Sequence, residues 1–445
     1  MSVPRAIRRS CCPAPRERVS TRVLVVGGGG REHALAWGLA RSALVDEVVC
    51  APGNPGMATI GECVPVSATD PRAVVDLAAK LDADLVVVGP EDPLVAGVVD
   101  ALEHAGRRAF GPSAAAARLE GSKVWMKEVL VAAGVPTARY ATFRAGQESA
   151  AFAYLETLPG RYVVKTDGLA AGKGVVVTES MAQARLAVRA YLSGAAFGDA
   201  GRTCVIEEGL TGPEVSLFAL CDGRRAQVLA TAQDHKRAYD GDAGPNTGGM
   251  GAYSPVPFVG ADIVDEMMER ALLPTLAELD RRGARYRGVL YCGLMLTPDG
   301  TKVLEYNVRF GDPECQVLVP RLTSDLFVHL SESAAGELAT PIELSGASCV
   351  GVVLAAAGYP PAPDRKGDVV SGIDPAGAHE GVVVFQSGTA FDDQGRVVTG
   401  GGRVLTVTAV GADVAHARNR AYAAAAEISW PGIHYRRDIG AQALS

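Results

Sequence analysis

The chain lacks several features that would place it in a specialised class of protein. No uninterrupted apolar run in its 445 residues approaches the roughly 20 residues that a membrane-spanning helix needs, so we expect a soluble protein. None of the nine cysteines forms a Cys-x-x-Cys pair, and no Gly-x-Ser-x-Gly or His-Glu-x-x-His motif occurs. These absences argue against triad hydrolases and the familiar zinc enzymes. We expect reduced thiols in a cytoplasmic protein.

Acidic residues outnumber basic ones, 50 to 43. The net charge is −7 and no long basic run occurs, which argues against non-specific nucleic-acid binding. Lysine in particular is scarce, with eight lysines against 35 arginines. Five of the eight fall in or beside Gly-rich and polar segments, namely Lys123, Lys127, Lys165, Lys173 and Lys236. A compact ammonium is not interchangeable with a guanidinium near phosphates, so these positions indicate phosphate contacts, with chance clustering as the alternative.

The first part of the chain predicts a parallel sheet. Residues 1–20 are rich in Arg and Pro and hold no apolar run, so we expect a disordered extension rather than a secretory signal. In a first domain at about 21–125, short apolar runs alternate with helical patterns. The runs lie at 23–26, 47–50, 85–88 and 108–110, and the helical patterns at 31–40, 71–80 and 94–105. Such alternation is typical of βαβ units.

The rest of the chain predicts two α+β domains, at about 126–338 and 345–445. The first begins with a helix through 124–133 and continues in hairpin-like pairs: 162–165 with 174–178, 204–208 with 214–221, and 288–296 with 301–309. The last domain carries Val-rich strands, three glycines at 400–402 and a helix around 415–428. We expect little polar chemistry from it.

The first Gly-rich loop follows the first apolar run. It is not a dinucleotide fingerprint, because the third glycine is replaced by Glu32 or His33, depending on whether one counts from Gly27 or Gly28. Its backbone N–H groups at a helix N-terminus suit a phosphate of some other ligand. A tight turn without a ligand is the alternative.

The second Gly-rich segment, residues 165–174, is not a Walker A loop. The spacing before Gly172 and Lys173 is one residue short, and Gly174 stands where Ser or Thr would bind magnesium. A flexible hairpin of this kind is suited to close over a triphosphate. An exposed hairpin without function is the alternative.

Two further groups of polar residues lie near predicted strand ends. Carboxylates at 207, 208 and 214 flank a turn and suit an adenine amino group and ribose hydroxyls, although charged turns are common. The dense block at 233–251 holds Asp234, His235 and Lys236, followed by a Gly-rich run, and suits a small zwitterion. For His235, a structural role is as good an interpretation as a catalytic one.

The predicted strand 302–309 is more specific. Period-two alternation places Val303, Glu305, Asn307 and Arg309 on one face, and Leu304, Tyr306 and Val308 on the other. Two hard oxygen donors in a row suit Mg²⁺ held jointly with phosphates, and the arginine suits charge that develops during transfer. A solvated strand face is the alternative.

Together these motifs resemble the glycinamide ribonucleotide synthetase family (phosphoribosylamine–glycine ligases) of the ATP-grasp superfamily, over about residues 22–440. The resemblance lies in GGREHA (28–33), APGNPG (51–56), VGPEDPLVAGVVD (88–100), FGPS (110–113), LEGSK (119–123), DGLAAGKGV (167–175), QDHKRAYDGDAGPNTGGMGAYSP (233–255), EYNVRFGDPE (305–314) and GGRVL (401–405). It implies an N-terminal parallel-sheet (pre-ATP-grasp) domain, a central ATP-grasp fold with a mobile lid, and a small C-terminal α+β domain.

The resemblance also implies roles for individual residues. ATP would be bound by Lys123, Lys165, Gly168, Gly172, Lys173, Gly174, Glu207, Glu208, Leu210 and Glu214, and Mg²⁺ or Mn²⁺ by Glu305 and Asn307. The catalytic group would be Arg309, Asp312, Lys236 and Asp234. Substrates would meet Gly28, Gly29, Gly30, Arg31, Glu32, His235, Asn246, Thr247, Gly248, Gly249, Met250 and Gly251.

The expected reaction is ATP-dependent ligation of glycine to 5-phosphoribosylamine through a glycyl phosphate, in purine biosynthesis. We expect a cytoplasmic monomer with small-molecule substrates only. Two alternatives stay open: another ATP-grasp ligase or carboxylase, and a non-catalytic nucleotide-binding module.

Overall fold

The computed structural model describes residues 20–169, 174–195 and 202–444. The N-terminal region forms the expected parallel sheet, in the order β3-β2-β1-β4-β5. Its strands are β1 (Arg22–Gly27), β2 (Glu47–Pro52), β3 (Glu62–Cys63), β4 (Leu85–Val88) and β5 (Ala109–Phe110), and its first helices are α1 (Gly30–Leu39) and α2 (Pro71–Leu81).

The prediction of one helix at 94–105 is wrong, because two helices occupy this segment. α3 (Glu91–Val95) ends before Gly97, and α4 (Val98–His104) begins after it. Gly97 adopts a φ of 84°, a left-handed conformation that interrupts a helix and that glycine tolerates best. α5 (Ala114–Gly121) and α6 (Lys123–Ala132) then lead out of this region, and Ser122 caps α6 by accepting a hydrogen bond from the Trp125 N–H.

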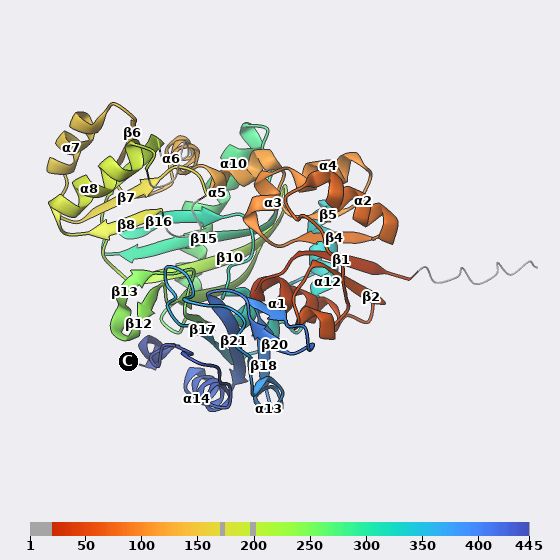
Figure 1. Cartoon of the computed structure of the whole chain (residues 1–445). Helices are drawn as coiled ribbons and strands as arrows, with labels where there is room; N and C mark the ends of the chain where they lie inside the picture. Colours follow the sequence, from red (N-terminus) through yellow and green to blue (C-terminus); the bar gives the residue numbers. More distant parts are fainter. Residues whose placement is uncertain (1–19, 170–173, 196–201, 445) are drawn as a thin grey trace, which may run out of the picture.

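The central region contains a small antiparallel sheet. Its order is β6 (Tyr140–Arg144), β9 (Thr203–Glu208), β7 (Tyr162–Thr166) and β8 (Val175–Thr178). α7 (Glu148–Glu156) and α8 (Met181–Leu192) cover one face and share a hydrophobic core with it (Figure 1).

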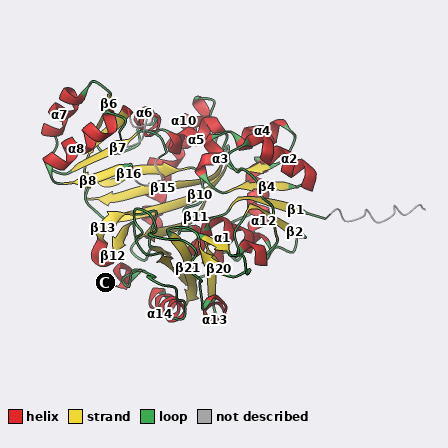
Figure 2. Ribbon diagram, viewed as in Figure 1, coloured by secondary structure: helices red, strands yellow, loops and turns green. Residues whose placement is uncertain are grey.

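A second sheet of eight strands runs through the middle of the molecule, with helices around it (Figure 2). Its order is β16 (Gly300–Asn307), β15 (Arg287–Thr297), β10 (Glu214–Asp222), β11 (Ala226–Asp234), β14 (Gly251–Ser254), β17 (Ser348–Ala355), β21 (Arg403–Gly411) and β18 (Val382–Gln386). β14 pairs with β17, so strands from the C-terminal region continue the sheet of the central region.

The remaining elements lie around this sheet. They are α9 (Ala261–Met267), α10 (Leu273–Arg281), α11 (Cys315–Leu318), α12 (Leu326–Ala335), α13 (Ile373–Gly377), α14 (Val414–Ala425), and the short hairpins β12 (Arg237–Tyr239) with β13 (Ala243–Asn246) and β19 (Thr389–Phe391) with β20 (Val397–Thr399). In the described part of the chain, no helix has the length and apolar character needed to span a membrane. The seven described cysteines are free thiols, six of them buried.

Two of the three predicted hairpins are confirmed, β7 with β8 and β15 with β16. The pairing of 204–208 with 214–221 is wrong, because β9 lies in the four-stranded sheet and β10 in the eight-stranded sheet. The residues between them carry the chain from one sheet to the other. Gly212, at φ +149°, lies so close to β15 that an added Cβ would come within 2.0 Å of the Leu296 carbonyl oxygen.

Candidate active site

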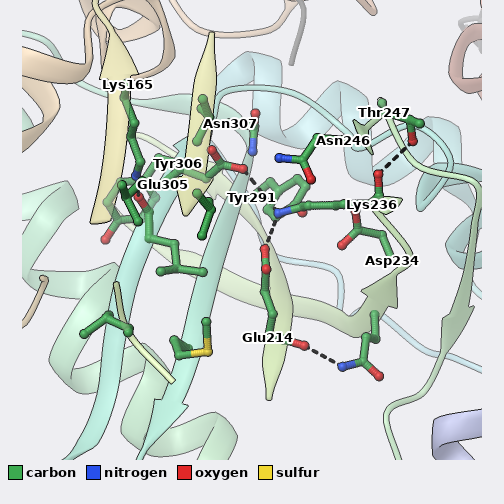
Figure 3. A pocket seen from close by; sticks show the side chains of 18 of the residues that line it. Lys165, Glu214, Asp234, Lys236, Asn246, Thr247, Tyr291, Glu305, Tyr306 and Asn307 are labelled. Carbon is green, nitrogen blue, oxygen red and sulfur yellow. Dashed lines mark hydrogen bonds and ion pairs between the residues drawn. The ribbon is translucent and has the colours of Figure 1, made fainter. Parts of the chain in front are cut away.

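A cavity of about 1010 Å³ lies between the two sheets and reaches the N-terminal region. Figure 3 shows part of its wall, where β10, β11, β15 and β16 present their polar side chains to one space. Eighteen of the predicted site residues line the cavity: Arg31, Lys123, Lys165, Gly174, Glu207, Glu208, Leu210, Glu214, Asp234, His235, Lys236, Asn246, Thr247, Gly248, Glu305, Asn307, Arg309 and Asp312.

The other ten predicted site residues fall into two groups. Gly172 and Lys173 fall outside the described residues, as does part of the expected lid. Eight more are described but do not line the cavity: Gly28, Gly29, Gly30, Glu32, Gly168, Gly249, Met250 and Gly251. Gly168 nevertheless accepts a hydrogen bond from Lys123 Nζ at 2.9 Å. Gly251 belongs to β14, where an added Cβ would meet the Gly351 carbonyl oxygen at 2.6 Å.

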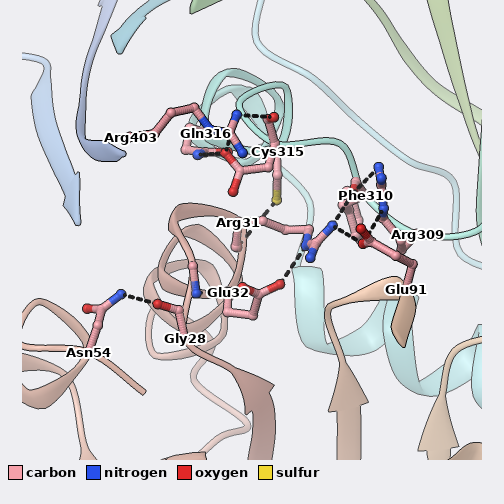
Figure 4. A network of polar contacts seen from close by, with 12 residues as sticks. Gly28, Arg31, Glu32, Asn54, Glu91, Arg309, Phe310, Cys315, Gln316 and Arg403 are labelled. Atoms are coloured by element: carbon pink, nitrogen blue, oxygen red, sulfur yellow. Dashed lines mark hydrogen bonds and ion pairs between the residues drawn. The ribbon is translucent and has the colours of Figure 1, made fainter. Parts of the chain in front are cut away.

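The first Gly-rich loop lies at the edge of the site. Glu32 is 1% exposed and accepts hydrogen bonds from the Gly29 N–H at 2.7 Å and from Arg31 Nε at 2.5 Å (Figure 4). The Gly28 carbonyl oxygen accepts from Asn54 Nδ2 at 2.9 Å. Glu32 therefore holds the turn from inside, and Arg31 carries its positive charge into the cavity. A role in substrate binding stays a prediction.

A buried ion-pair group closes one end of the cavity. Glu207 is 2% exposed, and its carboxylate oxygens lie 3.1 Å from the Nζ atoms of Lys127 and Lys165. Burial alone would raise the pKa of Glu207, but the two lysines outweigh it and hold that pKa below its ordinary value. Burial lowers the pKa of Lys127 to about 8. Lys127 was not predicted as a site residue, although the scarcity of lysine had pointed to it.

Lys236 is the centre of a second polar group. Its Nζ contacts Glu214 Oε1 and lies 3.6 Å from Glu305 Oε1 (Figure 3). Burial alone would lower the pKa of Lys236, but Glu214, Asp234 and Glu305 outweigh it and raise that pKa well above its ordinary value. Burial raises the pKa of Asp234 and that of the neighbouring Glu314. Glu314, inside the recognised EYNVRFGDPE motif, is a cavity residue that the sequence interpretation did not single out.

The polar row on β16 is present, with a shift in register. Glu305 pairs with Gly293, but Leu294 pairs with Val303, so Leu304 is the extra residue of a β-bulge. The bulge reverses the alternation before it: Leu304 lines the cavity, and Val303 lies in the core. The expected placement of these two residues is therefore wrong.

The donor set on β16 fits a hard cation. Burial alone would raise the pKa of Glu305, but Lys236, Lys165 and Lys123 lower it to about 2, so the carboxylate is ionised at neutral pH. The Asn307 side chain lines the same cavity two residues further on. No group of three or more His, Cys, Asp or Glu suited to a metal occurs in the described part of the chain. Glu305 and Asn307 thus suit an ion that takes its other oxygen ligands from phosphates and water.

Arg309 is held by carboxylates from the N-terminal region. Its Nη2 donates to Glu120 Oε1 at 2.8 Å and its Nε to Glu91 Oε2 at 3.1 Å. Glu91 also lies 3.5 Å from Arg31 Nη1 (Figure 4). Burial alone would lower the pKa of Arg309, but Glu120 and Glu91 outweigh it and raise that pKa. Neither acid was predicted, because each lies about 190–220 positions before Arg309 in the sequence.

The C-terminal region contributes polar chemistry as well, contrary to expectation. Arg403 of β21 lines the cavity, and its Nη1 donates to the carbonyl oxygens of Gly248 at 2.7 Å and Asp312 at 2.6 Å. The Gly248 N–H donates to Tyr359 Oη at 3.3 Å. The GGRVL motif was the signal for Arg403. Because the bonds are long-range, the motif alone did not show where the side chain reaches.

Comparison with known proteins bears directly on this site. Models of three phosphoribosylglycinamide synthetase domains match consecutive parts of the chain: the N domain at residues 21–120, the ATP-grasp (A) domain at 121–315 and the C domain at 349–442. The chain belongs to the phosphoribosylglycinamide synthetase family. It is an ATP-grasp ligase, which confirms the family resemblance.

Individual relatives agree with this assignment. Over 424 residues, the chain is 49% identical to the phosphoribosylamine–glycine ligase of Mesorhizobium japonicum and 50% identical to that of Caulobacter vibrioides, covering 95% of this chain and 98% of each relative. The crystal structure of the Thermotoga maritima phosphoribosylamine–glycine ligase is 35% identical, with a TM-score of 0.81 over 94% of this chain and 100% of that one.

More distant structures share the fold. The biotin carboxylase domain of the Hydrogenobacter thermophilus 2-oxoglutarate carboxylase is 16% identical, with a TM-score of 0.70 over 93% of this chain and 91% of that chain. The expected fold class, with an N-terminal parallel sheet, a central ATP-grasp fold and a C-terminal domain, is confirmed.

Proposed function

We propose that this chain ligates glycine to 5-phosphoribosylamine with ATP, giving glycinamide ribonucleotide, ADP and phosphate in de novo purine biosynthesis. One observation carries the proposal. Lys123 and Lys165 line the same cavity as the 233–248 block. Lys236 of that block connects the two parts through its contacts with Glu214 and Glu305. The two relatives described above are both named phosphoribosylamine–glycine ligase, and the chain matches each of them over 98% of its length.

ATP would occupy the space between the two sheets. Glu207, Glu208 and Leu210 lie where the chain crosses between sheets and would receive the adenine, and Glu214 the ribose. The ammonium groups of Lys123 and Lys165 would neutralise phosphate oxygens together with the 168–174 loop.

Glu305 and Asn307 would hold Mg²⁺ jointly with those phosphates, and the same oxygen donors also suit Mn²⁺. The metal, when bound, neutralises negative charge on the phosphoryl group that is transferred. A distant fold neighbour, the biotin carboxylase domain noted above, was crystallised with the magnesium salt of ADP.

The glycine carboxylate then attacks the γ-phosphorus, which releases ADP and leaves glycyl phosphate. The amine of phosphoribosylamine attacks the glycyl carbonyl, inorganic phosphate departs, and a proton leaves the nitrogen. Arg309 and Lys236 would stabilise negative charge in these steps, and Asp234 and Asp312 would orient the glycine.

The substrate sites would surround this centre. His235, Asn246, Thr247 and Gly248 line the cavity and would hold glycine, with residues 249–251 directly after them in the chain. Gly28–Glu32 would bind the phosphoribosylamine at the edge of the site beside Asp312. We further propose that the enzyme works as a monomer in the cytoplasm, where its free thiols remain reduced. Sedimentation of the purified protein tests the first of these statements.

An ADP-release assay with substrates omitted one at a time tests the proposed function. Release should require glycine and phosphoribosylamine together. Rapid turnover with bicarbonate would instead identify a carboxylase, and rapid turnover with D-alanine alone another ligase. No ADP release with glycine and phosphoribosylamine together would contradict the proposed reaction.

A further inference from the structure

The hairpin of β12 and β13 connects the cavity with the C-terminal segment. Arg237 pairs with Asn246, and Tyr239 with Ala243. Figure 1 shows this hairpin beside the C-terminal end of the chain, at the side of the molecule away from the N-terminal sheet.

The base of the hairpin enters the cavity on both strands. Lys236 comes directly before β12, and Thr247 directly after β13. The Thr247 N–H donates to the Lys236 carbonyl oxygen at 2.7 Å, and Thr247 Oγ1 donates to the same oxygen at 3.0 Å. Because these bonds tie the two strands together at the base, a rotation of the hairpin displaces Lys236 and Asn246 together.

Arg436 holds the hairpin from the C-terminal side. Its side chain is 1% exposed, and its Nη1 donates to Asp242 Oδ1 at 2.7 Å and to the Arg237 carbonyl oxygen at 3.1 Å. Nε and Nη2 donate to the two carboxylate oxygens of Asp438, each at 2.7 Å. The guanidinium therefore joins the tip of the hairpin, its first strand and the C-terminal segment.

Backbone bonds reinforce this contact. The Arg437 N–H donates to Asp240 Oδ1 at 2.7 Å, and the Gly241 N–H donates to Asp438 Oδ2 at 2.8 Å. On the other side, Tyr422 Oη of α14 donates to the Arg436 carbonyl oxygen at 2.8 Å. The C-terminal segment is thus bonded to α14 on one side and to the hairpin tip on the other.

Folding stability alone does not explain an arginine at this place. Buried ion pairs often contribute little net stability, and well-packed apolar side chains frequently replace them without loss. A guanidinium does supply fixed directions for several hydrogen bonds at once, which an apolar side chain cannot. Arg436 uses these directions on a hairpin whose base carries cavity residues.

We propose that Arg436 is a positioning residue for the binding of glycine. By fixing the hairpin tip, it keeps Lys236 and Asn246 in the positions in which they contact glycine. The identity of that substrate rests on the proposed function. The hydrogen bonds that join Arg436 and its neighbours to the hairpin, here called the latch, rest on the structure alone.

Two variants of the full chain test this inference. Arg436→Lys keeps the positive charge but loses the planar guanidinium and its several directed N–H groups. Asp438→Asn changes a partly exposed residue and is the second variant if Arg436→Lys fails to fold. Both should raise the KM for glycine about tenfold or more, because small misplacements of reacting groups are costly, and leave the KM for ATP within about twofold. Asp393→Asn, at an exposed acid on the distant β19–β20 turn, is the matched control and should match the wild type.

Hydrogen–deuterium exchange of the segment 237–247 in the unliganded protein provides a readout that needs no activity. It should be at least about tenfold faster in both variants and unchanged in the control. Unchanged exchange would overturn the latch, and faster exchange with an unchanged glycine KM would overturn the positioning role. A wild type that releases no ADP with glycine and phosphoribosylamine would overturn the proposed function instead, while the exchange result would still decide on the latch.

Discussion

Arg309 and Glu120 are bonded across the boundary between the N-terminal and central regions, with Arg309 Nη2 donating to Glu120 Oε1 at 2.8 Å. Glu120 also accepts a hydrogen bond from the Val308 N–H at 2.8 Å, so it holds both the backbone and the side chain at the end of the polar row. Burial raises the pKa of Glu120 to about 7 in spite of Arg309. These two contacts indicate that Glu120 positions the Arg309 side chain.

Glu120→Gln removes the ionisable carboxyl and keeps its shape. The glutamine oxygen still accepts from the Val308 N–H, so the fold should survive, but Arg309 loses one of its two acidic partners. We expect kcat to fall about tenfold or more, with a smaller change in the KM for ATP. The control is Glu103→Gln, which removes an exposed partner of Arg287 and should leave kcat unchanged. Steady-state kinetics decide, and a normal kcat for Glu120→Gln would refute the positioning role.

Glu305→Gln removes a charge from the proposed metal site while size and shape are kept. Transition-state stabilisation should fall by ~3 kcal/mol or more, on the order of a hundredfold or greater in rate, and added magnesium should recover part of it. Asn307→Ala should behave similarly but more mildly. The measurement is the magnesium dependence of the rate at saturating ATP.

Tyr306→Phe is the matched control for that series. Tyr306 also lines the cavity, but its hydroxyl is bonded within the core, where it contacts Thr275 Oγ1 at 2.7 Å and donates to the Ala271 carbonyl oxygen at 2.9 Å. Its loss should cost about 1–2 kcal/mol of folding stability and little rate. If this variant proved the most damaging to catalysis and Glu305→Gln kept a normal magnesium dependence, the metal assignment would be wrong.

Lys127→Met tests the buried ion-pair group at the proposed adenine end. Glu207 would keep Lys165 as its single cationic partner, so its position and charge would be less well fixed. We expect the KM for ATP to rise about tenfold while the KM for glycine stays within about twofold. Lys80→Met, at an exposed lysine, is the control. An unchanged KM for ATP would mean that Lys127 serves folding alone.

His33 should make the protein less stable in weak acid. The side chain is 5% exposed, its Nδ1 accepts a hydrogen bond from the Gln386 N–H at 2.8 Å, and burial lowers its pKa to about 4. The unfolded chain takes up this proton near pH 6.5 and the folded chain only near pH 4, so stability falls as pH drops through that window. At pH 5 the loss from His33 is about 2 kcal/mol relative to neutral pH.

Urea unfolding at pH 5, 6 and 7 measures this loss. His33→Asn places an amide oxygen where Nδ1 accepts, so it should unfold with a shallower dependence on pH than the wild type. His235, whose pKa burial also lowers to about 4, leaves part of the dependence in place. His104→Asn, at an exposed histidine, is the control. Equal slopes for wild type and His33→Asn would contradict the account.

Local patterns were enough to predict much of this molecule. Apolar runs and turn residues identified the parallel sheet and the hairpin of β15 and β16, and short-range motifs identified eighteen of the residues that line the cavity. The bulge at Leu304 escaped prediction because a register shift depends on the partner strand, and alternation within one strand does not reveal it.

Contacts between distant segments also escaped prediction. The turn after β9 resembles a hairpin turn, but Gly212 packs against Leu296 and directs the next strand into the other sheet. Arg403 and Arg436 contact the central region from more than 90 positions away, and no periodicity in their own segments records it. Tertiary packing decides such contacts.

Transfer of oxygen from glycine to phosphate is the most direct test of the proposed reaction. With glycine labelled by ¹⁸O in both carboxylate oxygens, attack on the γ-phosphorus followed by displacement must leave one labelled oxygen in inorganic phosphate and the other in the amide product. Mass spectrometry of both products measures this directly. Phosphate without label, alongside a labelled amide, would contradict the glycyl phosphate and with it the central claim.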